Sequence, residues 1–275
     1  MVSAREIKLM TYNVWSREDV AVYRRMQAIG DLVRQHQPDV IFFQEVTEHI
    51  RAIFASFDWW KDYNVRQAEP DYDMRSCFCL LLSKLPRDRN GSGSLRGSKA
   101  GRSYLTARVQ PGDGLEPIHV ATAHLESRAP PPSARCSERS AQAQQLVGAL
   151  DGKRNAVFGG DTGWDDDVDR PFPLRRGWVD AWAAAAGDDR GSGWTYDAVW
   201  EEEAAVFNGY AAPRSSLRRR SDRFVCKLTD YSIEGVEVIG GEGLGIRYEK
   251  KGETGDWIDL MPSCHRGLVL TIVPK

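Results

Sequence analysis

The sequence predicts a layered α/β fold, in which helices pack against β-sheet. Strand-like and helical patterns alternate along the 275 residues, which is typical of packed layers of sheet and helix. The stretch 39–46 has a continuous apolar run, so both faces of that strand should be covered. With 41% hydrophobic residues the chain can fill a sizeable core. Strand patterns resume directly after the one long Gly/Ser-rich stretch, so we expect a single domain over residues 1–275.

The positions of the elements follow from apolar periodicity and from turn residues. Apolar or alternating runs predict strands over residues 7–15, 39–46, 77–83, 104–109, 118–126, 155–158 and 268–273. Apolar residues three or four apart predict helices over residues 19–35, 48–57 and 137–150. Asp19 is the candidate N-cap of the first helix. The basic, Gly/Ser-rich stretch 87–101 is expected to be a surface loop, and 129–132 a stiff proline connector.

Charge and cysteine content narrow the function classes. The net charge is −2, so any contact with nucleic acid must come from a local basic patch. The most basic stretch, 214–223, contains Arg218–Arg220, which is either a solvated loop, a nucleic-acid patch or a nuclear import signal. Five scattered cysteines without a CxxC pair argue against disulfides and structural zinc. Together with the lack of an apolar leader or membrane span, this predicts a soluble protein of the nucleus and/or cytoplasm, without membrane contact.

Polar side chains stand at the ends of four predicted strands. They are Asn13, Glu45, His124 and Asp161. The strand that leads to Asp161 is expected to stop at two glycines and to present this carboxylate to solvent. Carboxylate oxygens hold hard cations such as Mg²⁺, and imidazole or amide donors stabilise phosphate oxygens. The pattern therefore indicates metal-assisted phosphate chemistry, with His265 before the last strand as a further candidate.

An ordered set of six motifs resembles the endonuclease/exonuclease/phosphatase superfamily. The motifs are Thr-Tyr-Asn13, Ile-Phe-Phe-Gln-Glu45, His124-Leu-Glu-Ser127, Gly-Asp161-Thr, Ser221-Asp222-Arg-Phe and Ser263-Cys264-His265-Arg-Gly-Leu. Within the superfamily, the third, fourth and fifth motifs are most similar to the tyrosyl-DNA phosphodiesterase 2 family. The stretch Tyr-Asn-Val-Trp-Ser-Arg-Glu-Asp, which contains Asn13, suggests a plant-type member.

The resemblance implies a four-layer α-β-β-α sandwich of the DNase I-like kind. It also implies hydrolysis of a 5′-tyrosyl-DNA phosphodiester with Mg²⁺ or Mn²⁺, which removes trapped topoisomerase adducts from DNA 5′ ends during repair. The roles that it implies are the following: metal ligand for Glu45; catalysis for Asn13, Asp161, Asp222 and His265; and substrate binding for His124, Ser127 and Tyr196. Asp161 would position the attacking water, and Asp222 would hold His265 as a cationic donor to phosphate. Tyr196 would stack near the scissile nucleotide.

Three positions depart from the family pattern. Gly163 stands where the family has Asn, Cys264 where it has Asp, and Asp165 where it has a basic residue. Loss of an amide donor costs roughly 10²–10³ in rate at well-studied sites, and a thiol is a poor partner for a hard cation. Two alternatives therefore stay open: a weakened or inactive member that binds DNA ends or a partner, and a phosphodiesterase for abasic DNA or for an inositol or lipid phosphodiester.

Overall fold

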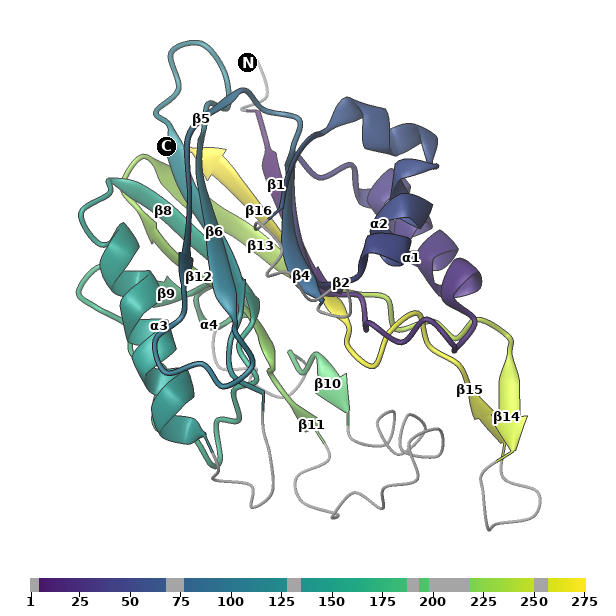
Figure 1. Cartoon of the computed structure of the whole chain (residues 1–275). Coiled ribbons are helices and arrows are strands. Elements are labelled where there is room, and N and C mark those ends of the chain that lie inside the picture. The colour runs from purple at the N-terminus through teal and green to yellow at the C-terminus, as the bar shows by residue number, and fades with distance from the viewer. Residues whose placement is uncertain (1–4, 68–76, 128–134, 187–192, 198–217, 250–256) are drawn as a thin grey trace.

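Two six-stranded β-sheets pack face to face, and helices cover their outer faces (Figure 1). The computed structural model describes residues 5–67, 77–127, 135–186, 193–197, 218–249 and 257–275. The first sheet has the strand order β13-β16-β1-β2-β4-β3. Its strands are β1 (Ile7–Asn13), β2 (Val40–Val46), β3 (Asn64–Gln67), β4 (Phe78–Ser83), β13 (Tyr231–Ile239) and β16 (Gly267–Pro274).

The second sheet has the strand order β5-β6-β7-β8-β12-β9. Its strands are β5 (Arg87–Ser94), β6 (Ser103–Val109), β7 (Ile118–His124), β8 (Asn155–Asp161), β9 (Val179–Asp180) and β12 (Asp222–Leu228). Two short antiparallel pairs lie apart from the sheets at one end of the molecule (Figure 1). They are β10 (Tyr196–Asp197) with β11 (Arg218–Arg219), and β14 (Arg247–Glu249) with β15 (Trp257–Asp259).

Three clusters of buried apolar side chains fill the space between the layers. The central one lies between the sheets and includes Phe42 and Phe224, whose ring centroids are 6.3 Å apart. Helices α1 (Val22–His36) and α2 (Glu48–Ala55), followed by the 3₁₀ helix η1 (Asp58–Asp62), pack on the outer face of the first sheet. Helix α3 (Cys136–Leu150) covers the second sheet, and the short α4 (Ala181–Ala186) contacts β12 and β13. The order helix, sheet, sheet, helix confirms the predicted four-layer sandwich.

The topology brings the ends of six strands to one edge. β1 runs parallel to β2, and β7 runs parallel to β8, so their carboxyl ends lie together. β16 is antiparallel to β1, and β12 is antiparallel to β8, so these two strands begin where the other four end. Every motif of the predicted site therefore meets at the same edge of the sandwich.

Two local predictions were wrong. Residues 87–94 form the edge strand β5 and not a loop, because pairing with β6 on one side satisfies this polar segment, and Arg108 bridges to Asp88 at 2.8 Å. Asp19 is not the cap of α1, which begins at Val22; its carboxylate accepts two hydrogen bonds from Arg17 instead.

Other parts of the fold were not predicted, or lie outside the described residues. Strands β3, β12 and β13 and helix α4 had no counterpart in the sequence prediction. The proline connector at 129–132 falls outside the described part of the chain. All five cysteines lie within that part, and none forms a disulfide. Among the described helices, none combines the length and the apolar character that crossing a membrane requires.

Candidate active site

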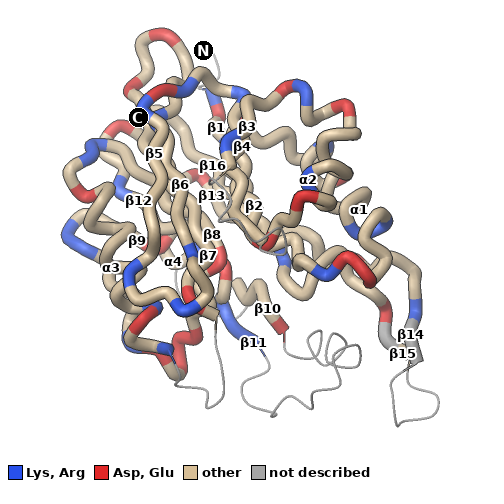
Figure 2. The backbone as a smooth tube through the Cα atoms, in the orientation of Figure 1, with Lys and Arg blue, Asp and Glu red and all other residues tan. Residues whose placement is uncertain are grey.

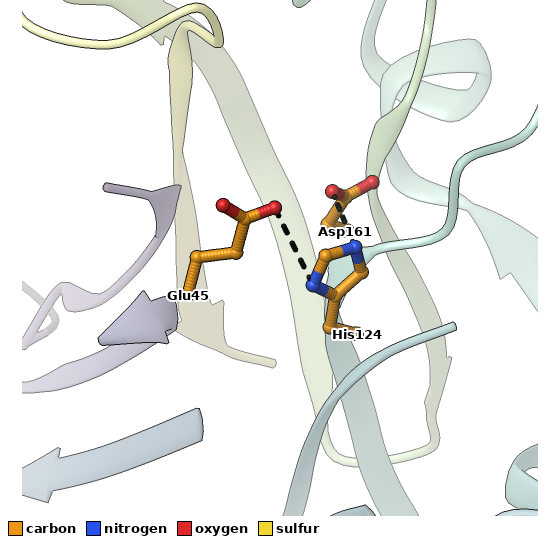
Figure 3. Close-up of side chains that lie close together, drawn as sticks. All are labelled: Glu45, His124 and Asp161. Carbon is orange, nitrogen blue, oxygen red and sulfur yellow. Dashed lines mark ion pairs between the residues drawn. The ribbon is translucent and has the colours of Figure 1, made fainter. Parts of the chain in front are cut away.

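Six polar side chains from six different segments meet at the edge where the strands end. Asn13, His124 and Asp161 are the last residues of their strands. Glu45 is the second-last residue of β2, and Asp222 is the first residue of β12. His265 precedes β16 by two residues. Figure 3 shows Glu45 reaching toward His124 and Asp161 from the facing sheet. The sequence prediction that these residues share one site is consistent with this geometry, while their individual roles stay predictions.

Glu45 is turned into the site by a β-bulge. The pairing between β2 and β4 shifts between Phe43 and Val46, and Glu45 has a φ of 57°, in the left-handed region that side chains other than glycine rarely adopt. Backbone strain of this kind is common at functional sites. The Ser16 amide and hydroxyl donate to Glu45 Oε2 at 3.2 and 3.1 Å, and Asn13 Nδ2 donates to Oε1 at 3.1 Å. One carboxylate is thus held in place by three donors.

Asp161 is buried, contrary to the expectation that it faces solvent; its exposed fraction is 3%. Asn13 Nδ2 donates to its Oδ2 at 2.8 Å, while the Gly163 amide and the Ser221 hydroxyl donate to its Oδ1 at 2.9 and 2.8 Å. Burial opposes ionisation, but the neighbouring imidazoles and these donors hold the pKa of Asp161 well below its usual range. The carboxylate is therefore ionised at neutral pH.

The strand that carries Asp161 does not stop at its glycines. β8 continues through Gly159 and Gly160 and pairs with β7 and β12 on both sides. A Cβ on Gly160 would lie 2.2 Å from the Ala123 carbonyl oxygen, so only glycine fits at this point of close contact. The glycines thus allow neighbouring strands to pack closely, and they do not form a turn.

His265 forms a buried pair with Asp222. Its Nδ1 lies 2.8 Å from Asp222 Oδ2, and its Nε2 lies 3.8 Å from Asp161 Oδ2. Burial alone would lower the pKa of His265, but the two carboxylates outweigh it and raise the pKa well above its ordinary value. The Ser263 hydroxyl accepts from the His265 amide at 3.1 Å and donates to the Asn13 carbonyl at 2.7 Å. The structure thus provides an imidazolium in a fixed orientation.

His124 has the opposite protonation state. Burial and the Arg102 guanidinium lower its pKa to about 4, although Asp161 and Glu45 act in the other direction. Arg102 contacts His124 Nδ1 and donates to the Ser127 hydroxyl at 2.7 Å. Because a guanidinium can only donate, Nδ1 must accept, and the single proton of the neutral ring is on Nε2. That Nε2 lies 3.2 Å from Asp161 Oδ2.

Arg102 is a site residue that the sequence reasoning missed. It follows the Gly/Ser-rich stretch that was assigned to a surface loop. Buried Glu126 anchors this segment by accepting from the Ser98 hydroxyl at 2.9 Å and from the Lys99 amide at 3.2 Å, while Arg135 bridges to its other oxygen. The Arg102 amide in turn donates to Ser98. The glutamate of the His-Leu-Glu-Ser motif was the available signal, because it binds the loop that brings a cation to His124.

A second missed residue, Arg25, links the segment after β1 to the segment before β16. Its buried guanidinium donates to the carbonyls of Val14 and Trp15 at 2.6 and 2.5 Å and to that of Pro262 at 3.1 Å. It also lies over the Trp15 ring, 4.4 Å from the centroid. The segment after β1 is thereby fixed to the segment before β16, which carries the half-buried Cys264.

Two of the three departures from the family pattern, Gly163 and Asp165, lie in the loop after β8. Gly163 has a φ of +57°, and Asp165 is buried. The Asp165 carboxylate accepts from the Asp167 amide at 3.0 Å, and its own amide donates to Asp169 at 3.0 Å. Asp169 forms a fully buried ion pair with Arg139 at 2.8 Å. Asp165 therefore stabilises the loop, which accounts for a carboxylate at this position.

Tyr196 lies at the rim of the site. Its backbone pairs with His265, and the two rings meet edge to face with centroids 5.2 Å apart. The Arg219 guanidinium lies 3.5 Å from the Tyr196 centroid, and only 2% of the residue is exposed. Stacking of a base on this ring would require Arg219 to move, so the role of Tyr196 in substrate binding stays a prediction.

Within the described part of the chain, two groups of side chains could hold a metal ion. Ligand atoms of Glu45, His124 and Asp161 lie within 4.8 Å of one another, as do those of Asp161, Asp222 and His265. The first group fits a hard divalent cation better through its two carboxylates, because Glu45 remains partly exposed and can exchange its donors for an ion. His124 is not available as a ligand in this arrangement, since Arg102 contacts its Nδ1 and its Nε2 carries the proton. In the second group, His265 is raised in pKa and paired with Asp222, which makes it a poor ligand.

Comparisons with known proteins identify the family to which the chain belongs. A family model described as endonuclease/exonuclease/phosphatase family matches residues 10–201. The chain is 25% identical over 212 residues to a 5′-tyrosyl-DNA phosphodiesterase of Caenorhabditis briggsae, covering 74% of this chain and 57% of the relative, and 25% identical over 213 residues to that of Caenorhabditis elegans, covering 74% and 55%. It thus spans a little over half the length of these curated relatives.

Solved structures show the same fold. D. rerio TDP2 complexed with single-strand DNA product superposes with a TM-score of 0.75 at 19% identity, covering 97% of this chain and 98% of that one. The human Nocturnin catalytic domain superposes with a TM-score of 0.69 at 14% identity, covering 98% and 94%. Because the family model covers more than half of the sequence, the chain belongs to the endonuclease/exonuclease/phosphatase family.

Proposed function

We propose that the protein is a divalent-metal-dependent phosphodiesterase that hydrolyses the 5′-tyrosyl-DNA bond and releases trapped topoisomerase peptides during DNA repair. One observation carries this proposal: an ionised carboxylate, Asp161, lies between an imidazolium, His265, and a second carboxylate, Glu45, at one edge of the sheets. The named relatives support the choice of substrate. Such a role would place the protein in the nucleus and/or cytoplasm.

The residues present suit a hard cation such as Mg²⁺, with Mn²⁺ as a substitute. Glu45 would hold it with help from Asn13, and the bound cation supplies positive charge to the phosphate oxygens. Asp161 accepts a hydrogen bond from the attacking water and orients it; with so low a pKa it is a weak base. His265 donates from Nε2 to a phosphate oxygen, and Arg102 adds a second cation near His124.

The leaving group explains why these groups suffice. Water adds to phosphorus and releases a proton to solvent, the bond from phosphorus to the tyrosine oxygen breaks, and the departing phenolate takes a proton from solvent. The products are a 5′ phosphate and a tyrosine. The phenol of tyrosine has a pKa near 10, so it can leave as phenolate without a strong general acid. Near neutral pH, His124 is neutral, with its proton directed to Asp161.

The test is hydrolysis of a 5′-phosphotyrosyl oligonucleotide with and without EDTA. Asp161→Asn keeps the shape but removes the charge, and we expect it to lower kcat by about 10³-fold or more. Asp167→Asn is the matched control, because it makes the same change at an exposed position six residues further along the chain. Hydrolysis that survives EDTA, or an Asp161→Asn protein as active as the control, would contradict the proposal.

Gly163 supports a second candidate, a weakened member that binds DNA ends without rapid cleavage. Only the backbone amide of Gly163 points to Asp161, and no side-chain amide is available from this position. The double variant Gly163→Asn with Cys264→Asp separates the two candidates. A strong rise in turnover indicates a slow enzyme, whereas an inert double variant together with a DNA-binding native protein favours the binding role.

A further inference from the structure

Four charged side chains beside the candidate active site form one ion-pair network. We call Asp166, Asp180, Arg220 and Arg223 the Asp180 network. Asp180 accepts from Arg220 Nη2 with both carboxylate oxygens, at 2.6 and 2.8 Å, and from Arg223 Nη1 at 2.9 Å. Arg223 Nη2 in turn donates to both oxygens of Asp166 at 2.7 Å. The side chains of Arg223, Asp180 and Arg220 are 2%, 11% and 14% exposed, so their contacts are made largely away from bulk water.

The network takes up two charged runs of the sequence. Arg220 ends the basic run 218–220, whose first two residues form β11, which Figure 2 shows in blue at the end of the molecule where the strand ends meet. Asp166 belongs to the acidic run 165–167 in the loop after β8. Arg220 is thus held by a carboxylate of its own chain, although the sequence left its run open between a solvated loop, a nucleic-acid patch and an import signal.

The two arginines of the network flank, in the sequence, two residues that contact the proposed reacting groups. These residues are Ser221 and Asp222. The Ser221 hydroxyl donates to Asp161 at 2.8 Å, and Asp222 Oδ2 lies 2.8 Å from His265 Nδ1. A shift of this short segment would therefore change the contacts of both the ionised carboxylate and the imidazolium.

In the described part of the chain, strand pairing supports the start of β12 on one side only. β8 pairs with it from Asp222 onward. On the other side, the two-residue strand β9 pairs with β12 first at Val225, three residues after Asp222. Asp180 lies in β9 opposite Val225, and its carboxylate reaches back to Arg223 and Arg220. The network thereby extends the support of β9 to the beginning of β12.

The Asp180 carboxylate keeps two largely buried cations together. Burial opposes its ionisation, but Arg223 and Arg220 outweigh burial and lower the pKa of Asp180. Its Oδ1 also accepts from the Trp182 amide at 3.1 Å, so the carboxylate is anchored to the backbone that follows β9. Without this charge, the two guanidinium groups would repel one another in a region of low dielectric. The residues between them would then lose their fixed position.

We propose that Asp180 is a positioning residue for the hydrolysis. It acts through the two arginines of the network, and it fixes Ser221 against Asp161 and Asp222 against His265. This inference rests on the proposed function and adds to it a residue that touches neither the substrate nor a metal ion. A small displacement is enough for a large effect, since misplacement of a reacting group by about 1 Å can cost about 10²-fold in rate.

Kinetics of Asp180→Asn test this role, because the variant keeps the size of the side chain and removes its charge. We expect kcat to fall roughly 10- to 100-fold and KM to stay within about 3-fold, since the residues that contact the substrate are unchanged. Asp230→Asn is the matched control. Asp230 accepts two hydrogen bonds from Arg154, at 2.7 and 2.6 Å, two residues beyond the opposite end of β12. The control should keep the native kcat.

Amide hydrogen exchange, followed by NMR, reports the position of the segment without turnover. The Thr162 amide donates to the Ser221 carbonyl at 2.8 Å, and the Asp222 amide donates to the Thr195 hydroxyl at 2.9 Å. In Asp180→Asn, the amides of Thr162 and Asp222 should exchange about 10-fold faster or more, because the segment that they hold opens more often. In the Asp230→Asn control, both amides should exchange at the native rate.

Arg220→Gln, alone and combined with Asp180→Asn, shows whether the two residues act together. Alone it breaks the contact that has two hydrogen bonds and leaves Asp180 paired with Arg223, so it carries the same measurements if Asp180→Asn does not fold. The double variant should lose no more kcat than Asp180→Asn, because both changes break one contact. Losses that add up in the double variant would mean that Asp180 does not act through Arg220.

The exchange rates separate this proposal from the proposed function. Native exchange of the Thr162 and Asp222 amides in Asp180→Asn would overturn the positioning role even if kcat falls, and so would a native kcat in this variant. A native protein that hydrolyses no 5′-phosphotyrosyl oligonucleotide would refute the proposed function. Faster exchange in Asp180→Asn and native exchange in Asp230→Asn would then still show that Asp180 holds this segment in place.

Discussion

Asn13→Asp is the most direct test of the geometry, because one amide nitrogen serves both carboxylates of the site. Asn13 Nδ2 donates to Glu45 Oε1 at 3.1 Å and to Asp161 Oδ2 at 2.8 Å. The substitution keeps the size of the side chain and replaces this shared donor with a third carboxylate. Three negative groups would then meet in a buried space where Asp161 is only 3% exposed.

The loss in free energy of unfolding follows from the two lost hydrogen bonds, and protonation of the new carboxylate limits it. Each hydrogen bond to a charged group contributes about 1.5–3 kcal/mol, so two contribute roughly 3–6 kcal/mol. The new carboxylate can escape repulsion by binding a proton, which costs about 5 kcal/mol at pH 7.5 from an ordinary pKa near 3.9. The expected loss in free energy of unfolding is therefore about 3–5 kcal/mol, or roughly 6–20 °C in Tm for a chain of this size.

Thermal unfolding in EDTA and in excess Mg²⁺ measures this loss and its relief. Asn64→Asp, at the exposed start of β3, makes the same chemical change and should leave Tm within about 2 °C. A divalent cation offsets the added charge, so Mg²⁺ should restore about half of the lost Tm in Asn13→Asp and raise that of the native protein less. If Asn13→Asp melts with the control in EDTA, or gains nothing extra from Mg²⁺, the carboxylates do not converge on a cation site.

Three further changes test other parts of the site. Ser221→Ala removes a 2.8 Å donor from Asp161, and urea unfolding should show a loss of about 1.5–3 kcal/mol; no loss would contradict the hydrogen bond. The pKa of His124 is about 4 when folded and near 6.5 when unfolded, so its contribution to stability is lost as the pH falls below 6.5. The loss should reach about 2 kcal/mol by pH 5, and His124→Gln should abolish this slope. Gly163→Asn should fold, because asparagine tolerates positive φ and its Cβ would meet the nearest atom at 3.4 Å. Kinetics should show kcat raised about 10-fold or more, and an unchanged kcat would exclude the missing amide as the limitation.

The strand ends could be predicted because apolar periodicity reports where a buried strand stops. Asn13 and Glu45 each follow an apolar run, and parallel neighbours place such ends at the same edge. What periodicity cannot show is a bulge. The turn of Glu45 into the site depends on its positive φ and on the shifted pairing with β4. The sequence thus predicts which carboxylate approaches the site, but not how it is aimed.

Arg102 was missed for a related reason. Its neighbours have the composition of a loop, and a Gly/Ser-rich segment carries no periodic signal. Its position depends on Glu126, which is buried at the end of β7 and holds the Ser98 region by side-chain and backbone contacts. Contacts between residues almost thirty positions apart are set by packing of the whole sheet, and local pattern does not report them.

The protonation states of the two histidines show most clearly what the fold adds. In the sequence, His124 ends one strand and is followed by Leu125, while His265 precedes another strand and is followed by Arg266, and neither context indicates the charge of the imidazole. In the structure both are buried, which by itself favours the neutral form of each. Their different states come from their neighbours: Arg102 against His124, and Asp222 against His265.

Asp222 and Arg102 are held in the site in different ways. Asp222 opens a strand paired with β8, so it is fixed opposite Asp161 by sheet register. Arg102 is carried by a loop that depends on a side-chain anchor. Weakening the anchor should therefore alter His124 and leave His265 unchanged. Glu126→Gln offers this separation, because NMR titration should show the pKa of His124 rising toward its ordinary value as Arg102 withdraws, while His265 stays protonated. A joint change in both histidines would mean that the two halves of the site are coupled more directly than their separate supports indicate.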